Sequence, residues 1–300
     1  MTDGGATVAD EAPRRPQGES SLALRMARVF LENRLASIGG ILIVVISLFC
    51  FAGPLFYHTN QVAGNLLNVN LPPGPGHPLG TDGVGYDVLG RLMAGGQSSL
   101  EIGVAVGVVS TMAGAAWGAI SGYLGGIPDA IMMRIVDTIL AIPAIFLFIY
   151  LATIVRPNVW LLIAVLSALS WLGPARLVRG EALSLRSREY AQAVAVMGGS
   201  RIRVVVRHII PNAIGTIVVN ATFQIADAIL VLATLSFLGF GLPPPAPTWG
   251  GMLANGTQYL ADGYWWQIYP AGILIVVTVV AFNFIGDALR DALDVRLQRR

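Results

Sequence analysis

The chain has 300 residues, of which 55% are hydrophobic and 12% are charged, and its formal net charge is +2. Soluble domains carry about 25% charged residues, so this composition excludes an ordinary water-soluble domain and indicates that lipid surrounds most of the chain. A single cysteine excludes an internal disulfide, and three scattered histidines disfavour a protein metal site. With so small a net charge, no nucleic-acid partner is expected.

The first 34 residues precede the first long apolar run. Residues 1–21 are polar and rich in Gly, Pro and Ser, so we expect a disordered tail. Residues 22–34 combine arginines with large apolar side chains, which predicts an amphipathic helix on an anionic membrane surface. The remainder, residues 35–300, is predicted to form one membrane domain.

Six apolar runs are each long enough to cross a hydrocarbon core of ~30 Å as a helix. They lie at about 35–57, 99–123, 130–155, 159–177, 213–240 and 267–289. The first run is too long for a signal-peptide core and has no small-residue cleavage site, so we expect it to remain as an anchor. The sequence therefore predicts an all-α integral membrane protein with six transmembrane helices.

The second run carries glycines four residues apart, at Gly103 and Gly107 and again at Gly114 and Gly118. This spacing lets helices approach closely. Any one pair is equally compatible with a merely glycine-rich bilayer helix.

The distribution of arginine predicts the orientation of the six helices. An even number of spans puts both termini on one side of the membrane. With the N- and C-termini in the cytoplasm, all of the 19 basic residues except Arg91 and Arg156 lie inside, as the positive-inside rule requires. The stretch from the end of the fourth run to the start of the fifth is especially basic: between Arg176 and Arg207 it carries Arg176, Arg179, Arg186, Arg188, Arg201, Arg203 and Arg207.

This basic segment, at about 178–212, is predicted to be a cytoplasmic helix, a break and a second helix. Residues 181–197 are good helix formers, and Gly198-Gly199 ends the helix because glycine adopts left-handed backbone angles without strain. Ser200 is placed to cap the second helix, and Pro211 suits the first turn of the next span. A small-residue helix of this kind is suited to close contact with a cytoplasmic partner.

The same segment resembles the EAA loop of ABC-importer permeases, in which a coupling helix sits in a groove of the ATPase subunit. Gln192 stands where the family has its Glu, and Val194 where it has its second Ala, while Gly198 and Pro211 match. The resemblance implies that the ATPase is contacted through Glu189, Tyr190, Ala191, Gln192, Ala193, Gly198, Gly199 and Arg201.

Three further segments resemble the dipeptide/oligopeptide/nickel permeases, and favour their C-type subunit over the B-type. These segments are His77 to Leu92, Leu235 to Gly250 and Asn283 to Arg296. Tyr86 replaces an Arg that is usual in the family, and Leu232 stands where relatives usually carry a Glu. Either that acid has moved by about one turn, to Asp227, or the position does not matter.

The resemblance implies a permease subunit of an ATP-driven importer for short peptides in the bacterial plasma membrane, forming half of the translocation pathway. It implies four kinds of partner: a homologous B-type permease, two ATPase subunits or domains, an extracytoplasmic binding protein, and membrane lipid. The chain has no Gly-x-x-x-x-Gly-Lys phosphate loop, so ATP and Mg are expected on the ATPase partners. We expect no catalytic residue, metal or cofactor in this chain. Dipeptides, longer peptides, nickel and other small solutes all remain open as cargo.

Acidic residues within or near the apolar runs are candidates for the pathway. A carboxylate in hydrocarbon costs at least ~2.5 kcal/mol, so each should face a cavity or a partner. Asp137 is expected to pair with Arg134 one turn away. Asp227 either lines the pathway, together with Gln224 and Ser236, or forms a hydrogen bond with a neighbouring helix.

A different class of protein, an ion-gradient-driven secondary transporter, would use Asp227 and Asp137 as proton or sodium sites. That class predicts inverted repeats, which the sequence does not display. A membrane-embedded enzyme would need clustered histidines or carboxylates at a water interface, and the sequence lacks them.

Overall fold

The computed structural model describes residues 33–154, 157–189, 194, 197 and 200–298. Within these residues the chain forms helices joined by turns and loops, and its β-type pairing is limited to isolated bridges at Gly74–His77 and Thr81–Asp87. The predicted tail (1–21) and almost all of the predicted surface helix (22–34) lie outside the described residues.

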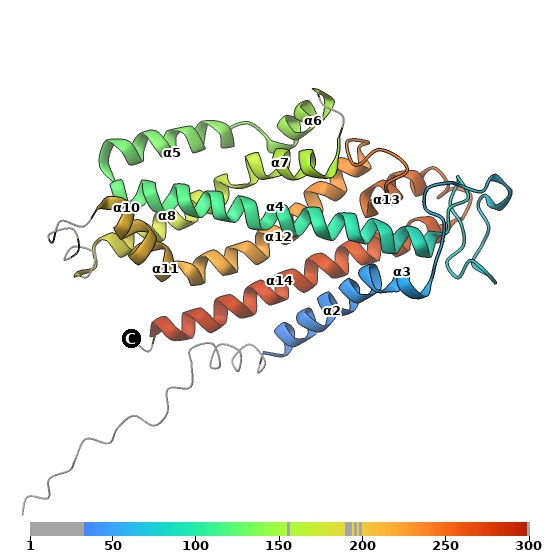
Figure 1. Ribbon diagram of the computed structural model, residues 1–300, viewed down its shortest axis with the longest axis horizontal. Helices are drawn as coiled ribbons and strands as arrows, with labels where there is room; N and C mark the ends of the chain where they lie inside the picture. The colour runs from blue at the N-terminus through green and yellow to red at the C-terminus, as the bar shows by residue number, and fades with distance from the viewer. Residues whose placement is uncertain (1–32, 155–156, 190–193, 195–196, 198–199, 299–300) are drawn as a thin grey trace, which may run out of the picture.

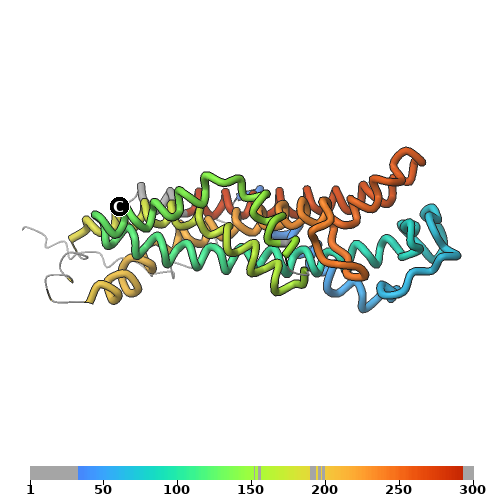
Figure 2. The backbone as a smooth tube through the Cα atoms, turned by 90° about the horizontal axis from the view of Figure 1, so that it is seen from above, coloured from blue at the N-terminus to red at the C-terminus, as the bar shows by residue number. Residues whose placement is uncertain are grey.

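Long helical segments run back and forth along one axis, and together they form a flattened bundle (Figures 1 and 2). The long helices are α2 (Arg34–Phe51), α4 (Val88–Leu124), α5 (Gly126–Leu140), α6 (Ala144–Ile154), α7 (Val159–Ser170), α8 (Leu172–Arg186), α12 (Ile214–Phe237) and α14 (Tyr269–Gln298). The short helical segments are α3 (Gly53–Phe56), η1 (Leu66–Asn68), α10 (Arg201–Val204), the π-helical turn η2 (Val205–Ile209), α11 (Ile210–Asn212), α13 (Trp249–Thr257) and η3 (Trp265–Gln267).

The two ends of the bundle differ. Residues 57–87 and 238–268 cover one end, here called the loop end, at the right of Figure 1. The opposite end carries the α4–α5 turn, the end of α8, and α10, and is here called the arginine end. Helix α2 begins and α14 ends toward the arginine end (Figure 1).

Four helical segments are long and apolar enough to cross a membrane unaided: α2, α4, α12 and the segment Trp265–Ala292 that contains most of α14. Two bent pairs pass the same test as broken spans: α5 with α6, bent by 77°, and α7 with α8, bent by 44°. The all-α membrane prediction is thus confirmed for the described residues, with the six predicted spans seen as four helices and two bent pairs.

The bends have local causes. Between α5 and α6 lies Pro143, which has no amide hydrogen to donate and whose ring clashes with the preceding helical turn. The third predicted span, 130–155, is therefore not one straight helix. Between α7 and α8 the helix breaks at Trp171, and Pro174 falls in the first turn of α8, where proline is tolerated. Helix α8 then continues well past residue 177, where the fourth span was predicted to end.

Helix α4 is the central element of the bundle and packs against α2, α7, α8, α12 and α13. It begins at Val88, before the predicted start at about residue 99, because Asp87 caps it by accepting a hydrogen bond from the Gly90 amide at 2.8 Å. Arg91 and Gln97 lower the hydropathy of this first part, which is why the apolar pattern alone placed the start too late.

Glycines of α4 allow two neighbouring helices to approach closely. A Cβ added to Gly107 would lie 2.4 Å from the Ile225 side chain of α12. A Cβ added to Gly118 would lie 2.3 Å from the Ala175 carbonyl oxygen and 2.8 Å from the Arg179 nitrogen, both on α8. The prediction that these glycines permit close helix contact is confirmed, with a different partner helix for each pair.

A glycine-to-alanine comparison tests this packing. Gly118→Ala is expected to lower the free energy of unfolding by about 1–3 kcal/mol, because the added methyl group collides with the backbone of α8. Gly180→Ala on the exposed side of α8 is the matched control, since a Cβ there meets nothing within 4 Å. It should stabilise the helix by roughly 0.5–1 kcal/mol. Thermal unfolding in detergent measures both, and equal behaviour of the two variants would contradict the packing argument.

Candidate functional site

At the arginine end, three helices are joined by one carboxylate. Arg179 of α8 donates two hydrogen bonds to Asp129 of α5, from Nε and Nη2, both at 2.6 Å. Ser121 of α4 also donates to the Asp129 carboxylate. Asp129 is buried, so this fork-to-fork ion pair with its added hydroxyl holds α4, α5 and α8 in a fixed arrangement.

Helix α8 ends at Arg186, so the predicted loop helix over 181–197 is wrong in its extent. The first residues of that segment instead prolong the fourth span. The Ser187 hydroxyl donates to the Ser184 carbonyl oxygen at 2.8 Å, a local bond that competes with helix continuation. After this turn Glu189 is exposed and helical, and Val194 packs against a cluster that contains Ala119, Val178 and Ile209.

The predicted coupling residues are only partly described. Tyr190, Ala191, Gln192, Ala193, Gly198 and Gly199 lie outside the described residues. Glu189 and Arg201 are both exposed at the arginine end. Ser200 caps α10 by accepting the Arg203 amide at 3.3 Å, so the predicted start of the second loop helix is confirmed.

The three pathway candidates on α12 do not share one face. Asp227 is exposed, whereas Ser236 is 5% exposed. Nine residues of α-helix turn through about 900°, which puts these two side chains on opposite sides. Gln224 donates a hydrogen bond to the Ser170 carbonyl oxygen at 3.0 Å, and so joins α12 to the bend between α7 and α8.

Asp227 belongs to an exposed face of α12 that also includes Leu230, Thr234 and Phe237. Leu232 is only 1% exposed and packs in a core with α4 and α7. If the family's Glu had moved by one helical turn, from position 232 to Asp227, both positions would lie on the same face of α12. Leu232 is buried and Asp227 is exposed, so the idea that Asp227 replaces that Glu is wrong. The exposed face of α2 differs in kind, because beyond Arg34 at its start the exposed large side chains are all apolar, as at Ile41, Val44 and Leu48.

Asp137 forms its ion pair with Arg176 of α8, at 2.5 Å, and not with Arg134 as predicted. The prediction failed because spacing along one helix reveals local neighbours only, whereas the packing of α5 beside α8 supplies the actual partner. Among the described residues, no group of three or more His, Cys, Asp or Glu side chains is suited to hold a metal ion.

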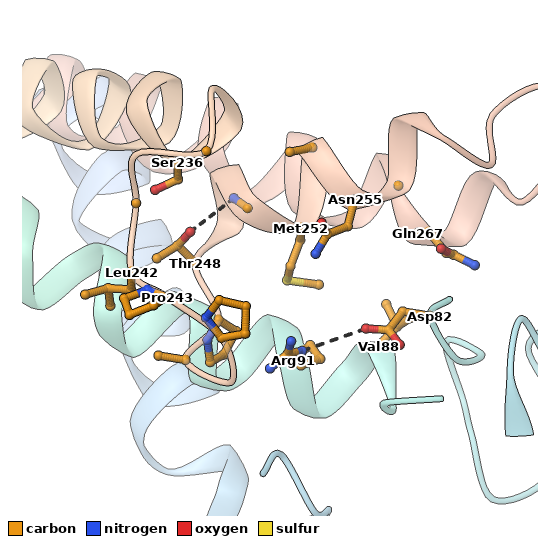
Figure 3. Close-up of a pocket in the computed structure, with 18 of the residues that line it drawn as sticks. Asp82, Val88, Arg91, Ser236, Leu242, Pro243, Thr248, Met252, Asn255 and Gln267 are labelled. Atoms are coloured by element: carbon orange, nitrogen blue, oxygen red, sulfur yellow. Dashed lines mark hydrogen bonds and ion pairs between the residues drawn. The ribbon is translucent and has the colours of Figure 1, made fainter. Parts of the chain in front are cut away.

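At the loop end, α4, α13 and the proline-rich segment 239–248 enclose a cavity of about 370 Å³ (Figure 3). Arg91 lines it from the first turn of α4 and is 8% exposed. Its Nη1 donates to the Pro245 carbonyl oxygen at 2.6 Å, and its Nε lies 3.8 Å from Asp82 Oδ2. The Tyr86 ring centroid lies 4.1 Å from the guanidinium carbon.

Sequence reasoning assigned no site role to Asp82, Tyr86, Arg91 or Asp129. One signal was available for the cavity. Arg91 is one of the two arginines that the orientation predicted from the sequence leaves outside, and a basic residue on that side needs a reason. Asp129 gave no comparable signal, because its partner Arg179 lies 50 residues away in the sequence.

Comparisons with known proteins agree with this geometry. Residues 114–299 match the family described as the binding-protein-dependent transport system inner membrane component. The chain belongs to this family. Residues 21–73 of the permease also match the family described as the N-terminal TM domain of oligopeptide transport permease C. The protein is therefore a multi-pass inner-membrane component of a transport system.

Curated relatives cover nearly the whole permease. The oligopeptide transport system permease protein OppC of Bacillus subtilis is 39% identical over 90% of this chain and 88% of its own length. A putative peptide permease protein of Brucella suis is 42% identical over 91% of each chain. OppC of Haemophilus influenzae is 36% identical over 96% of this chain and 93% of its own length.

Substitutions of two arginines on α8 test the Asp129 ion pair of the permease. Arg179→Gln leaves a buried carboxylate without its bidentate partner. It is expected to lower the free energy of unfolding by about 1–3 kcal/mol, at the lower end because the Arg179 side chain is 34% exposed. Arg186→Gln is the control two turns away, because Arg186 is exposed and makes only a 3.4 Å hydrogen bond to the Tyr123 carbonyl oxygen. Thermal unfolding of both purified variants gives the comparison, and an equal loss would refute the special role of Arg179.

Proposed function

We propose that this chain is a C-type permease subunit of an ATP-driven importer of short peptides, and that it forms half of the translocation pathway. The observation that carries the proposal is the end-to-end match to peptide permeases. Besides the oligopeptide permeases, the dipeptide transport system permease protein DppC of Bacillus subtilis is 34% identical over 89% of the chain. These relatives do not favour nickel or another small solute as cargo.

The arginine end is proposed to face the cytoplasm. The arginines that belong to this end are Arg179, Arg186, Arg188, Arg201, Arg203 and Arg207. An excess of basic residues marks the cytoplasmic side of a bacterial membrane protein. In this orientation the loop end, with residues 57–87 and 238–268, faces outward, where an extracytoplasmic binding protein would meet it.

Coupling to ATP hydrolysis is proposed to run through the loop between α8 and α10. The loop residues proposed to contact an ATPase subunit are Glu189, Tyr190, Ala191, Gln192, Ala193, Gly198, Gly199 and Arg201. Two observations support this role: the Asp129–Arg179 pair ties α8 to α4 and α5, and Val194 packs against residues of α4, α8 and η2. A movement of the loop is therefore passed to several helices at once.

The partners follow from this assignment. They are a homologous B-type permease, two ATPase subunits or domains that bind ATP and Mg, and the binding protein. In this mechanism ATP closes the ATPase pair, the loop moves with it, and the helices rock so that the pathway opens outward. The binding protein then releases the peptide into that opening.

The pathway side of the chain is proposed to be the exposed face of α12 that carries Asp227. A carboxylate facing lipid would cost at least ~2.5 kcal/mol, so this face suits a water-filled path or the partner permease. Beyond Arg34 at its start, the exposed face of α2 carries only apolar large side chains and suits lipid. A secondary transporter is not favoured, because Asp137 is engaged by Arg176 and a match to permeases of binding-protein-dependent systems covers most of the chain.

Labelling of single cysteines distinguishes these two faces. In a Cys50→Ala background, Leu230→Cys on α12 is expected to react with a membrane-impermeant maleimide at least ~10-fold faster than Val44→Cys on α2, because a maleimide needs an aqueous path to a reactive thiolate. Both positions are apolar, exposed and seven residues before the last residue of their helix, Phe237 or Phe51. Equal rates in the assembled complex would remove α12 from the pathway.

The overall function is tested on the complex isolated from native membranes with a C-terminal tag. A second permease and a P-loop ATPase are expected to co-purify, and the binding protein loaded with peptide should stimulate ATP hydrolysis. Gly198→Pro is expected to abolish that stimulation while basal hydrolysis and membrane insertion remain, because proline cannot adopt the left-handed backbone angles that the sequence predicts for the Gly198-Gly199 pair.

Two results would contradict the proposal. If the tagged chain is recovered from gentle detergent without an ATPase, the ATP-driven mechanism is wrong. If Gly198→Pro retains full stimulation, the loop is not the coupling element, although the permease assignment would stand.

A further inference from the structure

The cavity at the loop end contains a buried cation whose hydrogen-bonding capacity is mostly unused. An arginine side chain has five N–H donors. Among the described residues, the Arg91 side chain makes one hydrogen bond, from Nη1 to the Pro245 carbonyl oxygen. Its Nε lies 3.8 Å from Asp82, a distance that gives an ion pair but no hydrogen bond. A buried guanidinium with free donors is costly unless an acceptor occupies the cavity.

A second buried polar group lines the same cavity. The Ser236 hydroxyl has no hydrogen-bond partner within the described chain, and the residue is 5% exposed. Arg91 and Ser236 come from α4 and α12, so two of the principal helices each bring an unsatisfied polar group to one hollow (Figure 3). Unsatisfied buried groups of this kind call for a ligand or for ordered water.

Asp82 determines how strongly the cavity attracts an anion. Its Oδ1 accepts the amides of Val84 and Tyr86, both at 2.9 Å, which holds the carboxylate in place beside Arg91. The negative charge partly neutralises the guanidinium and weakens its hold on any anion. A transported ligand must bind a site strongly enough to enter it and weakly enough to leave it. The pairing of Arg91 with Asp82 meets both requirements.

The size and lining of the cavity narrow the class of ligand. Its volume of about 370 Å³ lies at the lower end of the range for small-molecule sites. Val88, Leu242, Met252 and several prolines supply apolar contact. A short peptide combines an ionised terminal carboxylate with side chains of varied polarity, and arginine recognises carboxylates through paired N–H donors.

We propose that this cavity, at the loop end and on the opposite side of α12 from Asp227, binds the terminal carboxylate of a short peptide on entry, before the peptide reaches the Asp227 face, with Arg91 as its cationic partner. Ser236 offers a further hydrogen bond, and Asp82 keeps the binding weak. This proposal rests on the peptide-import function proposed above. It adds a chemical preference, for a free carboxylate, that belongs to the permease itself and not to the binding protein.

The test compares a tripeptide, tri-alanine, with its C-terminal amide. Initial uptake rates are measured in proteoliposomes that contain the whole complex, with the binding protein saturated by either peptide so that its own preference does not enter. For Arg91→Gln, the ratio of free-acid to amide uptake is expected to fall about tenfold, equivalent to about 1.4 kcal/mol. For Asp82→Asn the ratio should rise several-fold, because a carboxylate that competes for Arg91 is removed.

Arg91→Lys gives a further check if the glutamine variant fails to assemble. Lysine keeps the positive charge but lacks the planar fork, so its ratio should lie between those of the wild type and Arg91→Gln. Opposite shifts for the Arg91 and Asp82 variants are the decisive signature, since a purely structural ion pair would lower the uptake of both peptides alike.

Each other outcome overturns a definite part of the argument. If the wild-type complex transports both peptides and the ratio is unchanged in all three variants, the carboxylate site is wrong and the import function stands. If both peptides lose uptake equally, Arg91 and Asp82 only support the fold. If the wild-type complex transports neither peptide, the proposed function fails and this site fails with it.

Discussion

Close contact between α4 and its neighbours is the constraint on which the rest of the structure depends. Lipid is as apolar as the side chains of these helices, so burial alone gives little reason for helices to associate in a membrane. What remains is van der Waals contact at short range, which requires small residues. Gly107 allows α12 to lie close to α4, and Gly118 does the same for α8. Because glycine has no side chain, these positions let α12 and α8 pack closely against α4. This packing positions two functional elements, the exposed face of α12 and the loop that follows α8.

Charged groups are used differently at the two ends of this bundle. At the arginine end, Asp129 and Arg179 form a short bidentate pair that joins three helices, and most arginines around it are exposed. At the loop end, Arg91 is buried and only loosely paired with Asp82. The first arrangement suits the transmission of movement through a rigid joint, and the second suits the brief binding of a charged ligand. The proposed import mechanism needs both.

The comparison of α2 with α12 illustrates how surroundings decide the role of an exposed face. Both helices present large side chains outside the chain's own core, yet only α12 adds Asp227 and Thr234 to that surface. A single carboxylate is enough to make lipid an unfavourable neighbour. The partner permease and the pathway between the two subunits are therefore best sought on the α12 side.

The sequence by itself determined the class of protein, the approximate positions of six apolar runs and the cap at Ser200, because hydropathy and capping are local properties of the chain. It also identified the family through motifs. Only the tertiary structure decided the partner of Asp137, the separation of Asp227 from Ser236 and the cavity around Arg91. These depend on which helices pack together and at what rotation, and long-range packing of that kind leaves no periodic signal in a single sequence.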